Sequence, residues 1–236
     1  MTRRAIFYDT ETTGLKPEKD RIIEIAAYDP TRDQTFQSLI NPECPIPPDT
    51  IRIHNITNEM VEKFPTFAVI AMDFIQFCGE NAILIAHNND AFDRPFVEEE
   101  CLRHKISLPK WDYIDSLKFS RKYRPDLPQH SLQYLREYHG IPANNAHRAL
   151  DDVKILQQVF FELIDDLPME MVLELMNQKT LCTHMHFGKY RGKPLEEIPS
   201  NYVQWLHKSG ALEKSSNAEL KKSFQNLGLL PTQDPI

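Results

Sequence analysis

The sequence contains no long apolar run, and this absence limits where the chain can reside. No window approaches the roughly 18 consecutive apolar residues that a membrane-spanning helix needs. The apolar stretch at residues 5–8 is also too short for the core of a secretory signal. We therefore expect a cytoplasmic protein with no membrane partner, and its 41% hydrophobic and 26% charged residues are typical of a soluble globular chain.

Paired cysteines are missing as well. Cys44, Cys78, Cys101 and Cys182 are scattered and form no C-x-x-C motif. In a reducing compartment, this distribution is typical of free and mostly buried thiols rather than of disulfides. Residues 182–186 read Cys-x-His-x-His and could place three zinc ligands on one face of a strand, but a fourth ligand is not evident. A zinc site is therefore a minor alternative.

Positive charge is in short supply, since 27 Lys or Arg stand against 34 Asp or Glu and the net charge is −7. The imbalance is uneven along the chain. Residues 178–236 hold eight basic and five acidic residues, a balance of +3. Because the whole chain carries −7, the preceding residues carry −10. An acidic body with a basic tail is compatible with a metal site in the one part and phosphate contacts in the other.

The order of the expected elements favours an α/β fold. Strands are expected at residues 5–8, 21–28, 34–40 and 81–86, and helices at residues 92–104, 115–123, 131–138 and 147–164. Four prolines between residues 42 and 48 argue against regular structure there. Because three strands come first and helices then alternate with strands, we expect one sheet domain over residues 1–168.

A small C-terminal domain is expected over residues 169–236. It begins with a connecting helix at residues 169–177 and continues with a basic hairpin around Tyr190, then a helix capped by Ser200 that carries Tyr202, Trp205 and Leu206. Binding of substrate or of a partner is its expected role. The segment 188–194 reads Gly-x-x-x-Gly-Lys-Pro, one residue shorter than a P-loop and with proline in place of Ser or Thr, so a nucleoside triphosphatase is excluded.

The first chemically informative stretch is the end of the first expected strand. Asp9 and Glu11 stand two positions apart, so in an extended chain their side chains point the same way. Two such carboxylates repel each other, and a hard divalent cation with oxygen ligands is the usual way to offset that repulsion. The alternative is a polar turn that simply closes the strand.

Two further carboxylates appear later in the chain. Asp93 lies at an expected helix start, where helix capping is the alternative to a functional role. Asp152 falls on the same face of its helix as Ala149 and Val153, which are apolar. A carboxylate directed at the core is costly unless it is paired or binds a metal, whereas Asp151 points about 100° away and is expected to be solvated.

These stretches resemble the three motifs of the DnaQ-like, DEDDh-type 3′–5′ exonucleases, and their order and spacing agree with that family. The matching segments are Asp9-Thr10-Glu11, Asn89-x-x-Phe92-Asp93 and His147-x-Ala149-x-x-Asp152. The tail at residues 187–193 is similar to the C-terminal segment of exonuclease X-like proteins. Two departures are a second motif one residue longer than the common form, which leaves Asn88 or Asn89 as the family asparagine, and Asn55 in place of glycine.

The resemblance implies an RNase H-like fold, with a mixed five-stranded sheet flanked by helices and a small C-terminal hairpin-plus-helix extension. It also implies two divalent cations, Mg²⁺ or Mn²⁺, about 3.5–4 Å apart. Asp9, Glu11 and Asp152 would hold one ion, and Asp9 and Asp93 would help to hold the second. His147 would act as the general base. Candidates for contact with the 3′ end are Glu11, Thr12, Gly14, Leu15, His54 and Asn89.

The implied activity is removal of nucleoside 5′-monophosphates from the 3′ ends of single- or double-stranded DNA, in repair or proofreading. One alternative is a proofreading subunit that resembles the epsilon subunit of a replicative polymerase and has a polymerase or another replication or repair protein as partner. Another is an RNA-trimming exoribonuclease. A metal-free binding module is disfavoured because all five catalytic positions carry the expected residue type.

Overall fold

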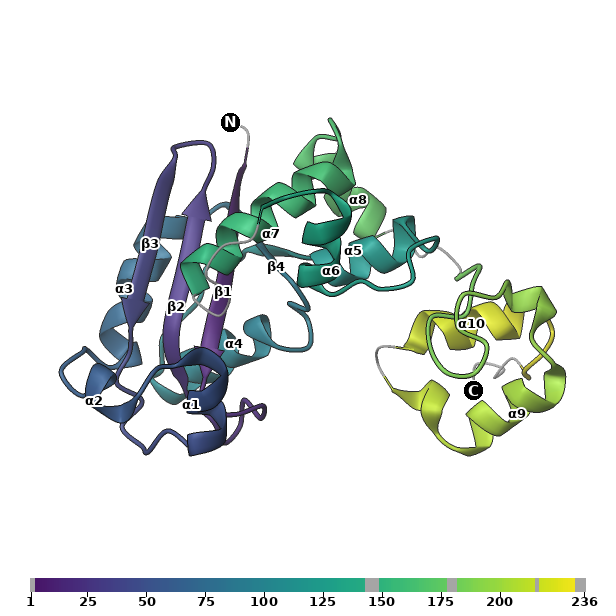
Figure 1. Ribbon diagram of the computed structural model, residues 1–236, viewed down its shortest axis with the longest axis horizontal. Helices are drawn as coiled ribbons and strands as arrows, with labels where there is room; N and C mark the ends of the chain where they lie inside the picture. The colour runs from purple at the N-terminus through teal and green to yellow at the C-terminus, as the bar shows by residue number, and fades with distance from the viewer. Residues whose placement is uncertain (1–2, 143–148, 178–181, 215–216, 232–236) are drawn as a thin grey trace. The chain divides into compact units, whose positions relative to one another are not determined.

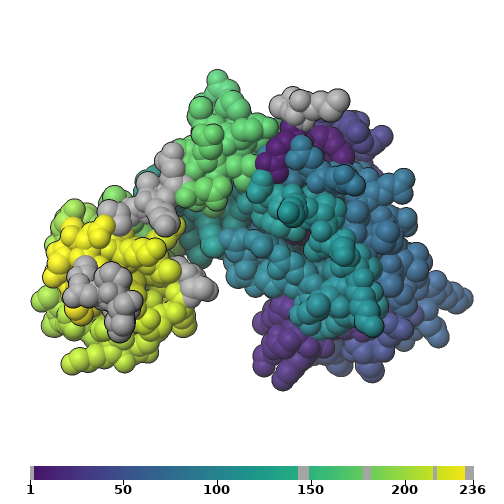
Figure 2. All heavy atoms as spheres, turned by 180° about the vertical axis from the view of Figure 1, so that it is seen from behind, coloured from purple at the N-terminus to yellow at the C-terminus, as the bar shows by residue number. Residues whose placement is uncertain are grey.

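The computed structural model describes residues 3–142, 149–177, 182–214 and 217–231. The chain divides into two compact units. The first comprises Met1–Phe119 and Gln129–Leu173, and the second comprises Ser120–Pro128 and Glu174–Ile236. Each unit packs around its own set of buried apolar side chains. In the space-filling view, the atoms coloured yellow-green to yellow, which belong to the later part of the second unit, pack closely together (Figure 2).

A five-stranded mixed sheet forms the centre of the first unit. Its strands are β1 (Arg4–Thr12), β2 (Ile22–Asp29), β3 (Gln34–Leu39), β4 (Ala82–Ala86) and β5 (Asp112–Asp115), in the spatial order β3-β2-β1-β4-β5. The first three strands pair antiparallel, whereas β4 runs parallel to both β1 and β5. This topology confirms the predicted α/β class and its mixed five-stranded sheet.

Helices flank both faces of the sheet: α3 (Phe67–Cys78) and α4 (Asp93–Arg103) lie on one face and α7 (Ala149–Ile164) on the other. The other helices before the end of α8 are α1 (Pro48–His54), α2 (Asn58–Val61), α5 (Ser116–Tyr123), α6 (Leu132–Tyr138) and α8 (Met169–Asn177). Ile6 and Tyr8 of β1 pack in one cluster with α3 and α4. On the other face, the Phe7 ring lies 5.9 Å from that of Phe160 on α7, which crosses β1 and β2 (Figure 1).

Three local expectations are corrected by the structure. Strand β1 continues to Thr12, so Asp9 and Glu11 lie within the strand and not in a turn after it. Pro48 does not interrupt regular structure but opens α1, because the first helical position needs no backbone N–H donor. Ser200 is the first helical residue of its helix, and the residue at the cap is Pro199.

The second unit has a helical framework. Beside α9 (Ser200–Lys208) and α10 (Ala218–Asn226) it contains two short 3₁₀ helices, Leu195–Glu197 and Ala211–Glu213. The expected hairpin forms a single antiparallel bridge, between His184 and Pro194, around the loop at residues 185–193. Val203, Leu206 and Phe224 belong to its fully buried core. Across the described parts of both units, no helix combines the length and hydropathy that a membrane crossing requires.

Candidate active site

Three carboxylates meet on the face of the sheet that α7 covers. Asp9 and Glu11 share this face because side chains alternate along β1, and Asp152 comes from the first turn of α7. Among the described residues, they form the group of possible metal ligands whose oxygen atoms lie within 4.8 Å of one another. Ala149 and Val153, which lie close to Asp152 on α7, are fully buried and fix the turn that carries it.

Asp93 approaches β1 from the opposite direction. It is the first residue of α4, only 1% exposed, and its Oδ1 accepts hydrogen bonds from the backbone N (3.0 Å) and the Oγ1 (2.8 Å) of Thr10. These bonds place the Asp93 carboxylate beside the backbone that connects Asp9 to Glu11. A fourth negative charge therefore lies next to the group of three.

Burial and mutual repulsion disfavour the ionised forms of these groups. Burial, followed by the charges of Asp93 and Glu11, raises the pKa of Asp9 well above its usual range. Burial, followed by the charge of Glu24, raises the pKa of Glu11 to about 8. Burial also raises the pKa of Asp93 to about 7, against the opposing effect of its bonds from Thr10. Divalent cations would offset this repulsion, so the donor set fits Mg²⁺ or Mn²⁺.

Glu24 is a fifth carboxylate, and the sequence patterns did not indicate its role. It lies directly opposite Glu11 in the antiparallel register of β1 and β2 and is 1% exposed. Its Oε1 accepts a 2.8 Å bond from Gln37 Nε2, while its Oε2 is buried without a hydrogen-bond partner. The available signal was a lone acidic residue inside the apolar run 22–27. Glu24 therefore adds negative charge next to Glu11. Its hydrogen-bond partner, the Gln37 amide, is neutral and does not balance that charge.

These shifts predict that the metal-free protein loses stability as the pH rises. Carboxyl groups with raised native pKa values bind protons more tightly when folded, so their protonation stabilises the native state at pH 5 and is lost towards pH 8. We expect the melting temperature in EDTA to fall by more than about 5 °C between these pH values. Excess Mg²⁺ should restore most of it at pH 8, and less in Asp152→Asn, as differential scanning fluorimetry can measure.

The variant Glu24→Gln tests the contribution of one carboxylate to this pH dependence of the melting temperature. The amide keeps an oxygen acceptor for Gln37 and removes one charge, so the variant should lose less stability than the wild type as the pH rises. Glu18→Gln, at an exposed position, removes the same charge elsewhere and should behave as the wild type does. A melting temperature that is independent of both pH and Mg²⁺ would contradict the crowded carboxylate site.

The turn after β1 carries the most exposed apolar side chain of this region. Leu15 is 81% exposed, which burial in a core does not explain. Thr12 is buried, and its Oγ1 donates a 2.6 Å bond to the carbonyl of Gly14. A Cβ at position 14 would meet the Asp20 carboxylate, whose Oδ2 accepts a hydrogen bond from the backbone N of Lys16, so glycine lets this carboxylate lie close to the turn. The Thr12 bond to Gly14 therefore helps to shape the turn that presents Leu15.

The other two expected substrate contacts are buried. His54 is 2% exposed at the end of α1, its Nδ1 accepts a bond from the backbone N of Ile56, and its Nε2 is buried without a hydrogen-bond partner. Burial lowers the pKa of His54, which favours the neutral ring. Asn89 has no exposed surface, accepts from the Tyr8 hydroxyl and donates to the carbonyl of Ile114. In this conformation the Asn89 side chain joins β1 to β5.

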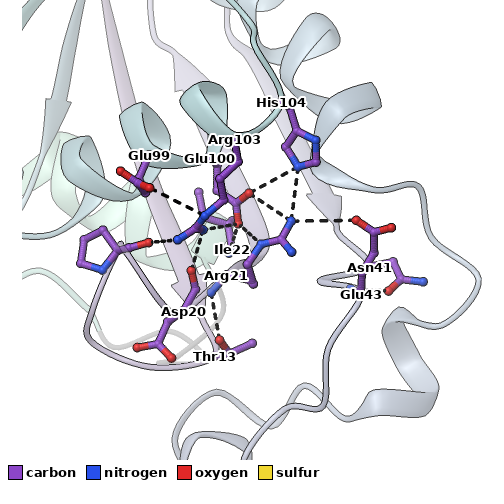
Figure 3. Close-up of polar contacts among 11 residues, drawn as sticks. Thr13, Asp20, Arg21, Ile22, Asn41, Glu43, Glu99, Glu100, Arg103 and His104 are labelled. Carbon is purple, nitrogen blue, oxygen red and sulfur yellow. Dashed lines mark hydrogen bonds and ion pairs between the residues drawn. The ribbon is translucent and has the colours of Figure 1, made fainter.

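A buried ionic network ties the Leu15 turn to helix α4 (Figure 3). Glu100 is fully buried, and its carboxylate accepts from Arg21 Nε (2.7 Å) and Nη2 (3.2 Å) and from the backbone N of Ile22 (3.2 Å). Arg103 donates to the carbonyl of Asp20. The start of β2 and the end of the turn are thus held by the last two turns of α4.

Breaking this network should cost considerable stability. Glu100→Gln leaves two arginines without their shared anion, and loss of one partner of a buried pair costs about 3 kcal/mol or more. Glu98→Gln is the matched control, because it removes an exposed pair with Arg94 on the same helix, where the cost is below about 1 kcal/mol. Urea denaturation of both variants measures the difference, and equal losses would show that burial does not matter here.

Two sequence expectations remain to be placed. His147 lies outside the described residues, so its position relative to the carboxylates stays a prediction. The alternative zinc segment does not form a metal-ligating group among the described residues, where the Asp9, Glu11 and Asp152 group is the one present. His186 instead makes a 2.9 Å hydrogen bond between its Nε2 and Asn217 Oδ1.

Comparison with known proteins identifies the family to which the first unit is similar. Residues 6–160 match the exonuclease family model named for RNase T. The chain is 37% identical over 162 residues to DNA polymerase III subunit epsilon of Treponema pallidum, covering 66% of this chain and 74% of that protein. It is 34% identical over 183 residues to the chloroplastic and mitochondrial exonuclease DPD1 of Arabidopsis thaliana, covering 70% of this chain and 58% of that one.

Solved structures agree on the fold. Exonuclease X in complex with 5′-overhanging duplex DNA matches with a TM-score of 0.55 at 22% identity, covering 73% of this chain and 99% of that chain. Escherichia coli exonuclease I in complex with a dA16 oligonucleotide matches with a TM-score of 0.62 at 20% identity, covering 76% and 44%.

The second unit matches a different model. Residues 170–218 fit a family described as "Putative quorum-sensing-regulated virulence factor". That description assigns no chemistry to the segment. The exonuclease model, by contrast, spans more than half of the chain and contains Asp9, Glu11, Asp93 and Asp152. The chain therefore belongs to the DnaQ-like exonuclease family, the 3′–5′ exonucleases with a DEDD carboxylate site.

Proposed function

We propose that the protein is a metal-dependent 3′–5′ exodeoxyribonuclease that releases nucleoside 5′-monophosphates from the 3′ ends of DNA. The observation that carries this proposal is the convergence of Asp9, Glu11 and Asp152 within 4.8 Å on one face of the sheet. Two elements that are far apart in sequence bring these carboxylates together. No structural need of the fold explains three anions at that distance, whereas a phosphodiesterase site that binds divalent cations requires them.

Each residue has a distinct part in this proposal. Asp9, Glu11 and Asp152 would hold one Mg²⁺ or Mn²⁺, and Asp93 with Asp9 would help to hold a second. When bound, the cations supply the positive charge that stabilises the transition state of phosphoryl transfer and favours deprotonation of water. Thr10 keeps the Asp93 carboxylate beside β1 through two hydrogen bonds. His147 takes the proton of the attacking water.

Restriction to chain ends requires a surface that receives the terminal nucleotide. Leu15 is the strongest candidate, because it is 81% exposed on a turn that is hydrogen-bonded by Thr12 and by Arg103 of α4. Its side chain would pack on the terminal base. His54 and Asn89 would contribute less, because both side chains are buried in this structure, although His54 Nε2 has no hydrogen-bond partner.

Three physiological settings were compatible with the sequence, and we favour a free-standing enzyme that trims DNA ends. The resemblance of the tail to exonuclease X-like proteins and the independent core of the second unit support this choice. Residues 169–236 would then act as an accessory domain. The proofreading alternative draws on the similarity to subunit epsilon of Treponema pallidum, and co-purification with a polymerase would favour it. The free cysteines fit the reducing cytoplasm that we propose as its location.

Digestion of end-labelled nucleic acids tests the activity. Single-stranded DNA, duplex DNA and RNA of matched sequence, each with a 5′ label, are incubated with and without Mg²⁺. We expect a ladder that shortens from the 3′ end of DNA, free nucleoside 5′-monophosphates, and no products in EDTA. Circular single-stranded DNA is the control without ends. Its cleavage, or a stronger activity on RNA, would overturn the assignment to an exodeoxyribonuclease.

A further inference from the structure

The second unit presents an aromatic surface in which an exposed tryptophan lies beside two tyrosines. The rings of Tyr202 and Trp205 on α9 stack with centroids 5.5 Å apart and an angle of 24° between their planes. Tyr190 meets Tyr202 edge-on at 4.8 Å. Tyr190 and Tyr202 also pack on the core of the unit, but Trp205 is not part of that packing and is 58% exposed. The indole is therefore available to a ligand.

A basic loop lies against this surface. The Tyr202 hydroxyl accepts a 3.2 Å bond from the backbone N of Lys189, and a Cβ at Gly188 would lie 2.5 Å from the same oxygen. The close approach of the loop to α9 therefore depends on glycine at this position. Lys189 Nζ lies 5.4 Å from the centre of the Tyr190 ring. Lys189, Arg191 and Lys193 are all exposed, and residues 188–193 contain no acidic side chain.

We propose that this aromatic and basic surface binds single-stranded DNA, with bases stacked on Trp205 and Tyr202 and phosphates against Lys189 and Arg191. The proposal rests on the proposed function, which supplies DNA as the ligand. Stacking on exposed aromatic rings beside a cationic track is how proteins hold unpaired strands without reading their sequence. A duplex keeps its bases inside the stack, so it offers the indole no partner. The charge balance of +3 over residues 178–236 suits a polyanion within a chain that is acidic as a whole.

Binding of the full-length protein to oligo(dT) of about 20 nucleotides, longer than a typical single binding site, tests the proposal. Measurements are made in EDTA, so that no hydrolysis occurs. Trp205→Ala should weaken binding about fivefold to a hundredfold, as expected for loss of one stacked base. Trp205→Phe keeps an aromatic ring and should retain most of the affinity. Circular dichroism of both variants verifies that the fold is unchanged.

Intrinsic fluorescence reports directly on the stacking. The chain has two tryptophans, and Trp111 is 6% exposed inside the first unit. Oligo(dT) should quench the emission of the wild type, and Trp205→Phe should bind without this quenching. Duplex DNA of equal length should give a much weaker quench. Equal affinity and equal quenching by duplex and single strand would overturn the proposal, as would unchanged affinity of Trp205→Ala.

The salt dependence of binding tests the phosphate interactions. Lys189→Ala combined with Arg191→Ala should lower the slope of log affinity against log salt by about 1.4, or roughly 0.7 for each phosphate that the variant no longer neutralises. Lys214→Ala combined with Lys222→Ala removes the same charge from exposed positions elsewhere in the unit and should leave the slope unchanged. Equal slopes for both double variants would overturn the role of the loop.

The outcome is separable from that of the proposed function. Hydrolysis in Mg²⁺ of a short, saturating substrate depends on the carboxylates of the first unit, and Trp205→Ala should leave its rate unchanged. Hydrolysis by the wild type together with normal binding by Trp205→Ala would reject the surface and keep the enzyme. Absence of hydrolysis by the wild type would reject the enzyme, whatever the binding result.

Discussion

Asp152→Asn should reduce the rate of DNA hydrolysis in Mg²⁺ by at least about 1000-fold. This effect is larger than the usual effect of removing a single hydrogen-bond donor to a transition state. Asparagine keeps the shape of the side chain but removes the charge that attracts the cation. Because Asp9, Glu11 and Asp152 lie within 4.8 Å of one another, the substitution would remove one of the three charged ligands of a single cation. The expected defect is in turnover, measured with a 5′-labelled single strand at saturating concentration.

Asp151→Asn is the matched control for this prediction. It makes the same chemical change one residue earlier on the same helix, about 100° around the helix axis. Asp151 is not a member of the group formed by Asp9, Glu11 and Asp152. We expect Asp151→Asn to keep most of the activity. If Asp151→Asn were instead the inactive variant, the helical phase that directs Asp152 to the metal site would be wrong.

His147→Ala should lower turnover by about 10²–10⁴-fold, the usual contribution of a general base. Neutral imidazole accepts the proton of water, so the activity of the wild type should rise with pH as the His147 ring loses its proton. The variant should lose this pH dependence. Both effects are measured as kcat across the pH range.

Metal affinity distinguishes a base from a ligand. As a base, His147 does not hold the cations, so calorimetric titration of His147→Ala with Mn²⁺ should give the affinity of the wild type. His54→Ala offers a control histidine, because His54 is buried at the end of α1 and has no part in proton transfer. Weaker Mn²⁺ binding by His147→Ala would make His147 a metal ligand and would contradict its assignment as a base.

Local patterns were sufficient to predict most of the first unit. Alternation along β1 placed Asp9 and Glu11 on one face, and the apolar period of α7 directed Asp152 to the core side. Both signals lie within a few residues of the side chain that they orient. The helix expected at residues 169–177 is found with the same bounds as α8. In these places the local sequence and the tertiary structure require the same conformation.

Contacts between distant segments were not predictable in the same way. Glu24 became part of the site only because the register of β2 places it opposite Glu11. Similarly, Glu100 and Arg21 are 79 positions apart, and neither sequence neighbourhood indicates the ion pair. Asn89 is predicted to contact substrate because its motif marks a functional loop, and the motif did not indicate the bonds of its amide to Tyr8 and Ile114. Register and burial decide these roles.

Helix α4 is hydrogen-bonded at both ends to the segments that the proposed reaction uses. Its first residue, Asp93, holds the backbone of Thr10, and Glu100 and Arg103 hold the turn that presents Leu15. The seven helical steps from Asp93 to Glu100 span about 10 Å, and this length cannot change without breaking backbone hydrogen bonds. The helix thus fixes the separation between the Asp93 carboxylate, beside which a strand would be cut, and the turn whose Leu15 would receive the strand end.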